Sequence, residues 1–340
     1  MQTPSKLHAA VIGLGIGEFH AEIYDAHRGV ELDTICDLNN VRLEEIHLKH
    51  PKTKTTTEAE KILTDSRIDI VSICSYDDMH AEQILMAAKN NKHIFVEKPL
   101  CLTKNELEQI TNALEKNKNI SLSSNFVLRT FPIFKELKQK ISTQDLGEIY
   151  CVEGDYNYGR LEKLLTGWRG KTPQYSISHG GGIHLIDLIT WLTDLKVNKV
   201  CSISSNIASR KSEYPGCDTM SSIIEFTSGA IGKVCSNYAS FGPHHHALRV
   251  FGTKGSFFYD GQSAYYYYER DNKSSAPIKH ISTRSLKANK TEKSEILHSF
   301  IEYLLFSQKP SVTTSEVLES MNISLAIEQS RIEERWISIL

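Results

Sequence analysis

The sequence predicts an α/β protein whose N-terminal part is a Rossmann-type, doubly wound parallel sheet. Short apolar runs alternate with amphipathic stretches of helical length through the first third of the chain. A glycine-rich turn follows the first apolar run. The chain has 340 residues, which is more than one hydrophobic core usually serves, so we expect a second domain.

The first apolar run, residues 7–13, is typical of a buried parallel strand. It leads into "GLGIGEFHAEIYDAH", in which the usual dinucleotide-binding spacing would place a third glycine at position 18, where this chain has Glu18. The physical needs of the turn are still met, because Gly13 permits the bend and Gly15 lets the backbone approach a pyrophosphate at the start of the next helix. The predicted cofactor-binding residues of the turn are Gly13, Gly15, Ile16 and Gly17.

A second apolar run, residues 30–37, ends in Asp37, which lies 24 residues (37 − 13) after Gly13. This is near the spacing expected for the acidic residue that binds the adenosine ribose. A carboxylate at this place accepts hydrogen bonds from ribose hydroxyls and repels a 2′-phosphate. The pattern therefore predicts NAD as cofactor, while the nearby Arg42 leaves NADP possible.

The alternation continues with strands predicted over 67–75, 92–100 and 119–126, and with helices over 78–91 and 104–117. Ligands of such sheets bind at the carboxyl ends of the strands. Lys98 is followed by Pro99 at the end of an apolar run, where a lysine aimed at the ligand explains an otherwise poor choice of residue. The residues predicted to bind cofactor at these ends are Ser75, Tyr76, Glu97, Lys98 and Asn125.

Composition narrows the classes of partner. The chain is 40% hydrophobic and 24% charged with a net charge of −2, which gives no electrostatic case for nucleic acid. No stretch approaches the roughly 20 apolar residues of a membrane helix. Seven cysteines without a CxxC pair suggest reduced thiols. We therefore expect a cytoplasmic protein that binds neither nucleic acid nor membrane.

Seven segments together resemble the Gfo/Idh/MocA oxidoreductase family, which includes glucose–fructose oxidoreductase, inositol dehydrogenase and several sugar-nucleotide dehydrogenases. They occur in family order and cover nearly the whole chain: "VIGLGIGEFHA", "ICDLN", "HAEQILMAAKNNKHIFVEKPL", "SSNFVLRTFP", "LGEIYCVEGDY", "GGGIHLIDLITWL" and "HALRVFGTKGSF".

The resemblance implies a Rossmann domain over residues 1–124 and a substrate-binding and oligomerisation domain of α+β type over 125–340. The second domain would contain an open, largely antiparallel sheet with helices on one face. Runs rich in β-forming residues, broken by Gly, Asn and Ser, support this independently. Because the open face of such a sheet needs covering, we expect a homodimer or homotetramer.

The resemblance also implies roles for two residues. Lys98 of "EKP" would contact the nicotinamide ribose and the reacting oxygen, where its charge stabilises a developing alkoxide. His184 matches the family's histidine, which suits a general base because its pKa lies near the working pH. Asp187, at i+3, either orients this imidazole or serves packing, and we favour packing.

The chain departs from the family at one position. Family members typically carry Asp four residues before the histidine, where this chain has Gly180. The only titratable neighbour is His179. Either Lys98 and His184 transfer protons alone, or His179 substitutes for the acid, or oxidation is not the main activity.

The resemblance points to further binding residues. His80 would lie near the cofactor, and Arg169 would suit a phosphate or carboxylate. In "HHH" at 244–246, adjacent strand residues alternate between faces and cannot all bind one ion, so we predict no metal and expect His244 or His246 to face substrate. The predicted substrate-binding residues are Lys98, Arg129, Tyr158, Trp168, Arg169, His184 and His246.

The leading hypothesis is hydride transfer between NAD(P) and a secondary alcohol or ketone of a sugar. A sugar nucleotide is preferred because five basic residues could contact phosphate: Arg129, Arg160, Lys163, Arg169 and Lys171. The alternatives are an inositol or free-sugar dehydrogenase, a cofactor-binding sensor without turnover, and transfer or elimination through a transient keto-sugar with NAD recycled.

Overall fold

The computed structural model describes residues 6–172, 174–270, 279–280 and 286–339. The chain divides into two compact units, Met1–Asn125 with Ser294–Glu319, and Phe126–Lys293 with Ser320–Leu340. The sequence-based division assigned everything beyond residue 124 to the second domain. The structure differs for residues 294–319, which group with the first unit because they pack on its sheet edge.

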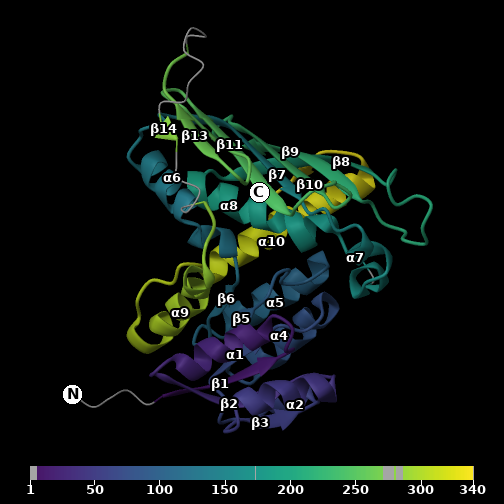
Figure 1. Cartoon of the computed structure of the whole chain (residues 1–340), viewed down its shortest axis with the longest axis vertical. Helices are drawn as coiled ribbons and strands as arrows, with labels where there is room; N and C mark the ends of the chain where they lie inside the picture. The colour runs from purple at the N-terminus through teal and green to yellow at the C-terminus, as the bar shows by residue number, and fades with distance from the viewer. Residues whose placement is uncertain (1–5, 173, 271–278, 281–285, 340) are drawn as a thin grey trace. The chain divides into compact units, whose positions relative to one another are not determined.

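The first unit contains a six-stranded parallel sheet of order β3-β2-β1-β4-β5-β6 (Figure 1). The order reverses between β1 and β4, and in such sheets the ligand crevice opens at the carboxyl ends of these two strands. The strands are β1 Leu7–Ile12, β2 Val30–Cys36, β3 Lys54–Thr56, β4 Ile70–Ile73, β5 His93–Val96 and β6 Leu122–Ser124. The predicted doubly wound Rossmann sheet is thus confirmed.

The helices of this unit are α1 Gly17–Ala26, α2 Asn40–Lys49, α3 Ala59–Leu63, α4 His80–Lys89 and α5 Lys104–Lys116. The start of α5 is fixed by a capping box, in which the Thr103 hydroxyl accepts from the Glu106 backbone and the Glu106 carboxylate accepts from the Thr103 backbone. The strands β1, β4 and β5 supply a continuous apolar core because nearly all of their side chains are buried.

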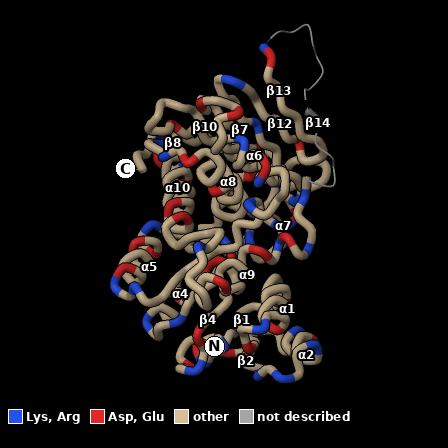
Figure 2. The backbone as a smooth tube through the Cα atoms, turned by 90° about the vertical axis from the view of Figure 1, so that its left-hand side faces the viewer, with Lys and Arg blue, Asp and Glu red and all other residues tan. Residues whose placement is uncertain are grey.

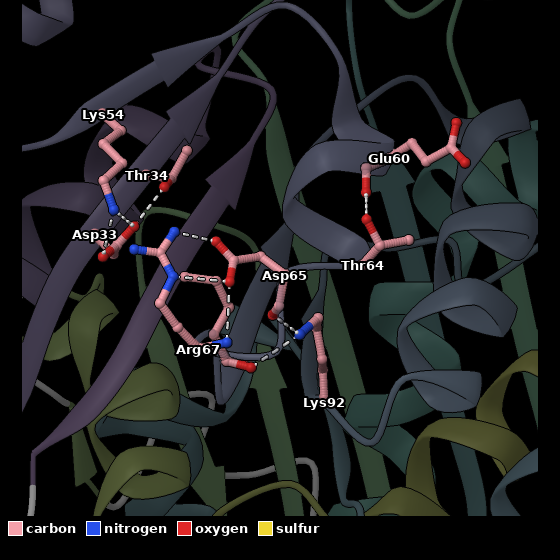
Figure 3. A network of polar contacts seen from close by, with 9 residues as sticks. Asp33, Thr34, Lys54, Glu60, Thr64, Asp65, Arg67 and Lys92 are labelled. Atoms are coloured by element: carbon pink, nitrogen blue, oxygen red, sulfur yellow. Dashed lines mark hydrogen bonds and ion pairs between the residues drawn. The ribbon is translucent and has the colours of Figure 1, made fainter.

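A polar network fixes the turn that enters β4 (Figure 3). The Lys92 ammonium group, although almost completely buried, donates to the carbonyl oxygens of Asp65 at 2.5 Å and Ile68 at 2.9 Å. The Asp65 carboxylate in turn accepts from the backbone and side chain of Arg67. Burial lowers the pKa of Lys92. The network sets where β4 begins, and β4 leads directly to the predicted cofactor residues after its end.

The outer edge of β6 is covered by residues 312–314, at the start of α10. The Thr314 hydroxyl accepts from the backbone N–H of Leu122 at 3.0 Å and donates to the Leu122 carbonyl at 2.8 Å. The Ser123 hydroxyl donates to the Val312 carbonyl. These bonds satisfy backbone groups that an open strand edge would leave exposed. They explain why residues 294–319 belong to the first unit.

The second unit contains a nine-stranded sheet of order β14-β13-β12-β11-β7-β10-β9-β8-β15. Only the β7–β10 pair is parallel among the described pairs. Its strands are β7 Ile149–Asn157, β8 Val197–Ser205, β9 Thr219–Phe226, β10 Ile231–Asn237, β11 His245–Gly252, β12 Ser256–Tyr259, β13 Ala264–Tyr267, β14 Lys279–His280 and β15 Ile337–Ser338. The predicted, largely antiparallel sheet is confirmed.

One face of this sheet is covered by helices, which Figure 1 shows as α6, α8 and the later part of α10. The helices of the second unit and those that continue into the first are α6 Pro132–Ser142, α7 Glu162–Leu165, α8 Ile183–Thr193, α9 Lys290–Phe306 and α10 Thr314–Glu333. On strands β9 and β10, Ile223 and Ile231 are exposed, while their neighbours Ile224 and Val234 are buried in the core. The alternation gives the sheet one buried and one open face.

Acidic and basic positions are interspersed along α2 and α5 rather than gathered by sign (Figure 2). Within the described ranges, no helix is both long and apolar enough to cross a membrane. All seven cysteines lie in described parts of the chain and carry free thiols.

Candidate active site

The three glycines of the first turn have three different surroundings. Gly13 has a φ of +86°, and a Cβ there would lie 2.4 Å from the Cys74 carbonyl oxygen. Gly15 is exposed, and a Cβ there would meet nothing within 4 Å. Gly17 packs α1 against the sheet, because its Cβ would lie 2.8 Å from Val11. Bend, open approach and close helix packing are the requirements of a pyrophosphate-binding turn, and position 17 here fulfils the third.

Asp37 lies beside this turn at the end of β2. Its carboxylate accepts from the backbone N–H of Leu14 at 2.7 Å and of Asn39 at 2.8 Å. Arg42, the residue that left NADP possible, pairs with Glu18 and Glu45 and donates to the Leu14 carbonyl. A cation held by two carboxylates is a poor partner for a 2′-phosphate, so this arrangement fits NAD.

The residue before Lys98 is held by a buried polar chain. Glu97 Oε1 accepts from the Asn125 amide at 2.9 Å and lies 3.4 Å from His20 Nε2. The other ring nitrogen of His20 lies 3.2 Å from the Ser72 hydroxyl. Burial alone would raise the pKa of Glu97, but His20, Asn125 and the Lys98 charge together lower it. Glu97 is therefore ionised, and its contacts link α1, β4 and the residue after β6.

The residue after Lys98 is held as well. The Lys98–Pro99 peptide bond is cis. His80 is fully buried, with Nδ1 at 2.7 Å from the Pro99 carbonyl oxygen and Nε2 at 3.2 Å from that of Ser75. The Ser75 hydroxyl donates to Gln83. His80 thus joins two loops of the protein, Tyr76 stays half-exposed, and their contacts with cofactor remain predictions.

In the second unit, the segment before α8 is a π-helical turn, Ser178–Gly182, continuous with the helix. Helices with such turns often carry functional residues. Asp187 is completely buried and forms two bonds with Arg129, at 2.6 and 3.0 Å. The Arg129 guanidinium also lies 5.6 Å from the Trp191 ring centre. The packing role favoured for Asp187 fits this geometry, and substrate binding by Arg129 stays a prediction.

Around His184 the structure gathers aromatic and imidazole rings. The His184 ring lies 6.5 Å from the Tyr156 ring, nearly parallel to it, and 6.0 Å from the His246 ring. His244 and His246 both meet Tyr156, at 5.1 and 5.0 Å, whereas His245 points elsewhere and bonds the Pro243 carbonyl. The alternation predicted for the three histidines is therefore present. Among the described residues, no group of three potential ligands is placed to hold a metal ion.

The other predicted substrate residues of this unit lie near the same rings. Tyr158 lies 4.7 Å from the Tyr238 ring and 5.3 Å from the His244 ring. Trp168 lies 6.4 Å from Tyr175, and Arg169 stacks on Trp168 at 4.4 Å. The structure thus brings most of the predicted substrate residues of the second unit into one neighbourhood.

The position of His179 does not suit an acid or base that must reach substrate. Its side chain is buried, and Nδ1 lies 2.8 Å from the Ser324 hydroxyl of α10. Burial lowers its pKa to about 4, although the Glu328 charge opposes this. The imidazole is therefore neutral at physiological pH, and substitution of His179 for the missing acid stays a prediction without geometric support.

Side chains from neighbouring segments lie directly against the three glycines of the π-helical turn. A Cβ at Gly180 would lie 2.0 Å from the Tyr175 hydroxyl and 2.8 Å from that of Tyr238. At Gly181 it would lie 2.4 Å from the Tyr156 ring, and at Gly182 it would lie 2.6 Å from a serine hydroxyl of β10. The turn needs glycine because side chains of strands β7 and β10 and of residues outside the sheet fill the space that a Cβ would take.

Four residues of these sites were not anticipated from sequence: His20, Tyr156, Tyr175 and Tyr238. Tyr156 could have been found, because it shares a face of β7 with Tyr158 by two-residue periodicity. His20 lies one turn after the glycine turn on the buried side of α1. Tyr175 and Tyr238 left no local signal, since they meet only in the folded unit.

Comparison with known proteins assigns the chain to a family. A model described as the oxidoreductase family with an NAD-binding Rossmann fold matches residues 7–126. The Gfo/Idh/MocA C-terminal domain matches residues 134–258, so the two together cover more than half of the chain. The chain belongs to the Gfo/Idh/MocA oxidoreductase family. The predicted family, the NAD-binding domain and the assignment as an NAD-dependent dehydrogenase are thereby confirmed.

Curated relatives of this family member include inositol dehydrogenases. The scyllo-inositol 2-dehydrogenase (NAD+) of Bacillus subtilis is 30% identical over 266 residues, which are 74% of this chain and 73% of the relative. The myo-inositol 2-dehydrogenase of Thermotoga maritima is 26% identical over 262 residues, 75% of each chain.

Solved structures of the family share the fold. That of myo-inositol 2-dehydrogenase from Lactobacillus plantarum has a TM-score of 0.82 at 22% identity, covering 99% of this chain and 100% of the other. Levoglucosan dehydrogenase in complex with NADH and L-sorbose has a TM-score of 0.85 at 20% identity, covering 98% and 99%.

Proposed function

We propose that the protein oxidises a ring secondary hydroxyl of a neutral cyclic polyol, an inositol or a free sugar, with NAD. The observation that carries this is the cluster of tyrosine and histidine rings around His184. Aromatic rings and uncharged hydroxyl or imidazole groups suit the alternating apolar and polar faces of a polyol ring. The curated relatives are named for inositols, which supports the same class.

This proposal replaces the preference for a sugar nucleotide. That preference depended on basic residues free to bind phosphate. Arg129 is bonded to Asp187 in the interior, and Arg169 and Arg160 both lie against aromatic rings. A sugar nucleotide is therefore included among the compounds to be tested but is not the expected substrate.

We propose the following roles in the reaction. Bound NAD supplies the hydride acceptor. His184 takes the hydroxyl proton while the hydride leaves the same carbon, which yields a ketone, NADH and an imidazolium ion. The Lys98 ammonium stabilises the negative charge that develops on the oxygen. Glu97 and Pro99, each held by a histidine, fix the backbone on both sides of Lys98.

The test is a substrate screen with wild type, the two variants Lys98→Ala and His184→Ala, and one control variant. Each is incubated with NAD and with myo-inositol, scyllo-inositol, D-glucose, levoglucosan or UDP-glucose, and NADH is followed by absorbance. We expect wild type to oxidise a neutral polyol and both variants to lose about 10²-fold or more in kcat. Lys118→Ala, which removes an exposed lysine of the same unit, is the matched control.

Three outcomes would contradict this proposal. Binding of NADH, measured by fluorescence, without turnover of any compound would favour a sensor. Turnover of UDP-glucose alone would restore the sugar-nucleotide reading. Product formation without net NADH, detected by mass spectrometry, would indicate transfer with recycled NAD.

A further inference from the structure

The space in which a side chain at position 180 would begin is filled by two phenol hydroxyls. The Tyr175 and Tyr238 oxygens lie 3.0 Å apart, within hydrogen-bond distance. A Cβ at Gly180 would lie 2.0 Å from the first and 2.8 Å from the second, closer than real Cβ contacts come. The polar atoms at this place therefore belong to two tyrosines from other segments of the chain.

These hydroxyls join a network that leads to His184. The Tyr238 ring, whose hydroxyl bonds that of Tyr175, lies 5.8 Å from the Tyr156 ring. The Tyr156 ring packs against the His184 ring. Gly180 lies in the π-helical turn that runs directly into α8, whose second residue is His184.

The network is uncharged. Burial raises the pKa of both Tyr156 and Tyr238 above the usual value for tyrosine, and neighbouring tyrosines raise them further. Each phenol keeps its proton at neutral pH and both donates and accepts. A carboxylate in the same place would instead carry a negative charge and only accept.

We propose that Tyr175 and Tyr238 are positioning residues that hold Tyr156 and the start of α8, and through them His184, in place of a side chain at position 180. The inference rests on the proposed dehydrogenase function. In this proposal uncharged tyrosine side chains position His184, and proton transfer proceeds without a carboxylate at position 180.

The first test removes single oxygen atoms. Tyr175→Phe and Tyr238→Phe are assayed with NAD and the polyol that wild type oxidises best. We expect kcat to fall at least about tenfold, because a small displacement of a reacting group is costly, while NADH binding by fluorescence stays unchanged. Tyr266→Phe, at a buried tyrosine of β13, is the matched control and is expected to match wild type.

The second test introduces an acid. Tyr175→Ala combined with Tyr238→Phe removes both hydroxyls that a Cβ at position 180 would meet, and Gly180→Asp is then added to this double variant. We expect the double variant to lose activity and the triple variant to regain part of it. We also expect the acid limb of its kcat/KM profile to move to higher pH, because a nearby carboxylate favours imidazolium. Packing alone could restore activity but would not move the pH profile.

The outcomes are distinguishable. If both phenylalanine variants keep kcat within twofold of an active wild type, the inference is refuted alone. It is also refuted if Gly180→Asp lowers kcat further in a Tyr175→Ala/Tyr238→Phe protein with native melting temperature. If that double variant does not fold, the single phenylalanine variants decide. A wild type that binds NADH but oxidises no polyol refutes the proposed function and this inference with it.

Discussion

Acidification should destabilise the second unit through His179, and the variant His179→Asn should remove this effect. The His179 side chain is buried, its Nδ1 bonds the Ser324 hydroxyl, and Ser324 also bonds Ser178. The one carboxylate acting on it, that of Glu328, is bonded to Ser176 and Arg331. Protonating the imidazole in this place is unfavourable.

The size and sign of the effect follow from the pKa. It is lowered from 6.5 to about 4 by burial. Between these values the unfolded chain binds a proton that the folded protein does not, so stability falls as pH falls through this window and rises as pH rises. At about 1.4 kcal/mol per pKa unit, the loss at pH 4 is about 3 kcal/mol.

The assay is urea unfolding followed by tryptophan fluorescence between pH 7.5 and pH 4.5. The three tryptophans, Trp168, Trp191 and Trp336, all lie in the second unit, so the signal reports on that unit. Other groups contribute equally to both proteins, and the difference between wild type and His179→Asn isolates the imidazole. Equal pH dependence in the two proteins would refute the reasoning and revive His179 as a proton carrier.

Four other predictions test separate features. Asp187→Ala leaves the Arg129 charge buried and should cost about 3–5 kcal/mol in urea unfolding; a loss below about 1 kcal/mol would show that the pair is not desolvated. Asp37→Ser should raise the NADP-to-NAD ratio of kcat/KM about tenfold by removing charge beside the ribose; an unchanged ratio would mean that another residue selects the cofactor. Lys92→Met leaves two carbonyl oxygens without their ammonium donor and should lower the free energy of unfolding by about 1–3 kcal/mol; an unchanged urea midpoint would contradict this. Ile231→Lys on the open sheet face should convert the expected homo-oligomer to monomer in light scattering; an unaltered oligomer would place the interface elsewhere.

Local features of the fold could be predicted from sequence. The glycine turn and the strand end at Asp37 depend on neighbouring residues, and each was anticipated. The strand predicted over 92–100 ends at Val96, because the turn through Pro99 takes over. The elements α2, β3 and α3 were not anticipated, since their mixed charged and apolar residues give weak periodicity.

Features that join distant segments could not be predicted. The residues near Arg129 do not indicate that Asp187 will neutralise it, and the residues near Gly180 do not indicate that the Tyr238 hydroxyl will lie beside it. The direction of His179 was also hidden, because a π-helical turn changes which side chains share a face. The sequence thus indicates which residues can carry a given chemistry, whereas the residues that they contact are known only from the structure.

The covering of β6 by residues 312–314 has a consequence for synthesis on the ribosome. Domains usually fold in the order in which they emerge. Here the cofactor-binding unit lacks the cover of its sheet edge until residue 319 has been made, after the whole segment 126–293. At ordinary translation rates this wait is on the order of ten seconds or more. A nascent chain stalled near residue 125 would therefore expose a strand edge, which makes this interval the one in which a chaperone matters most.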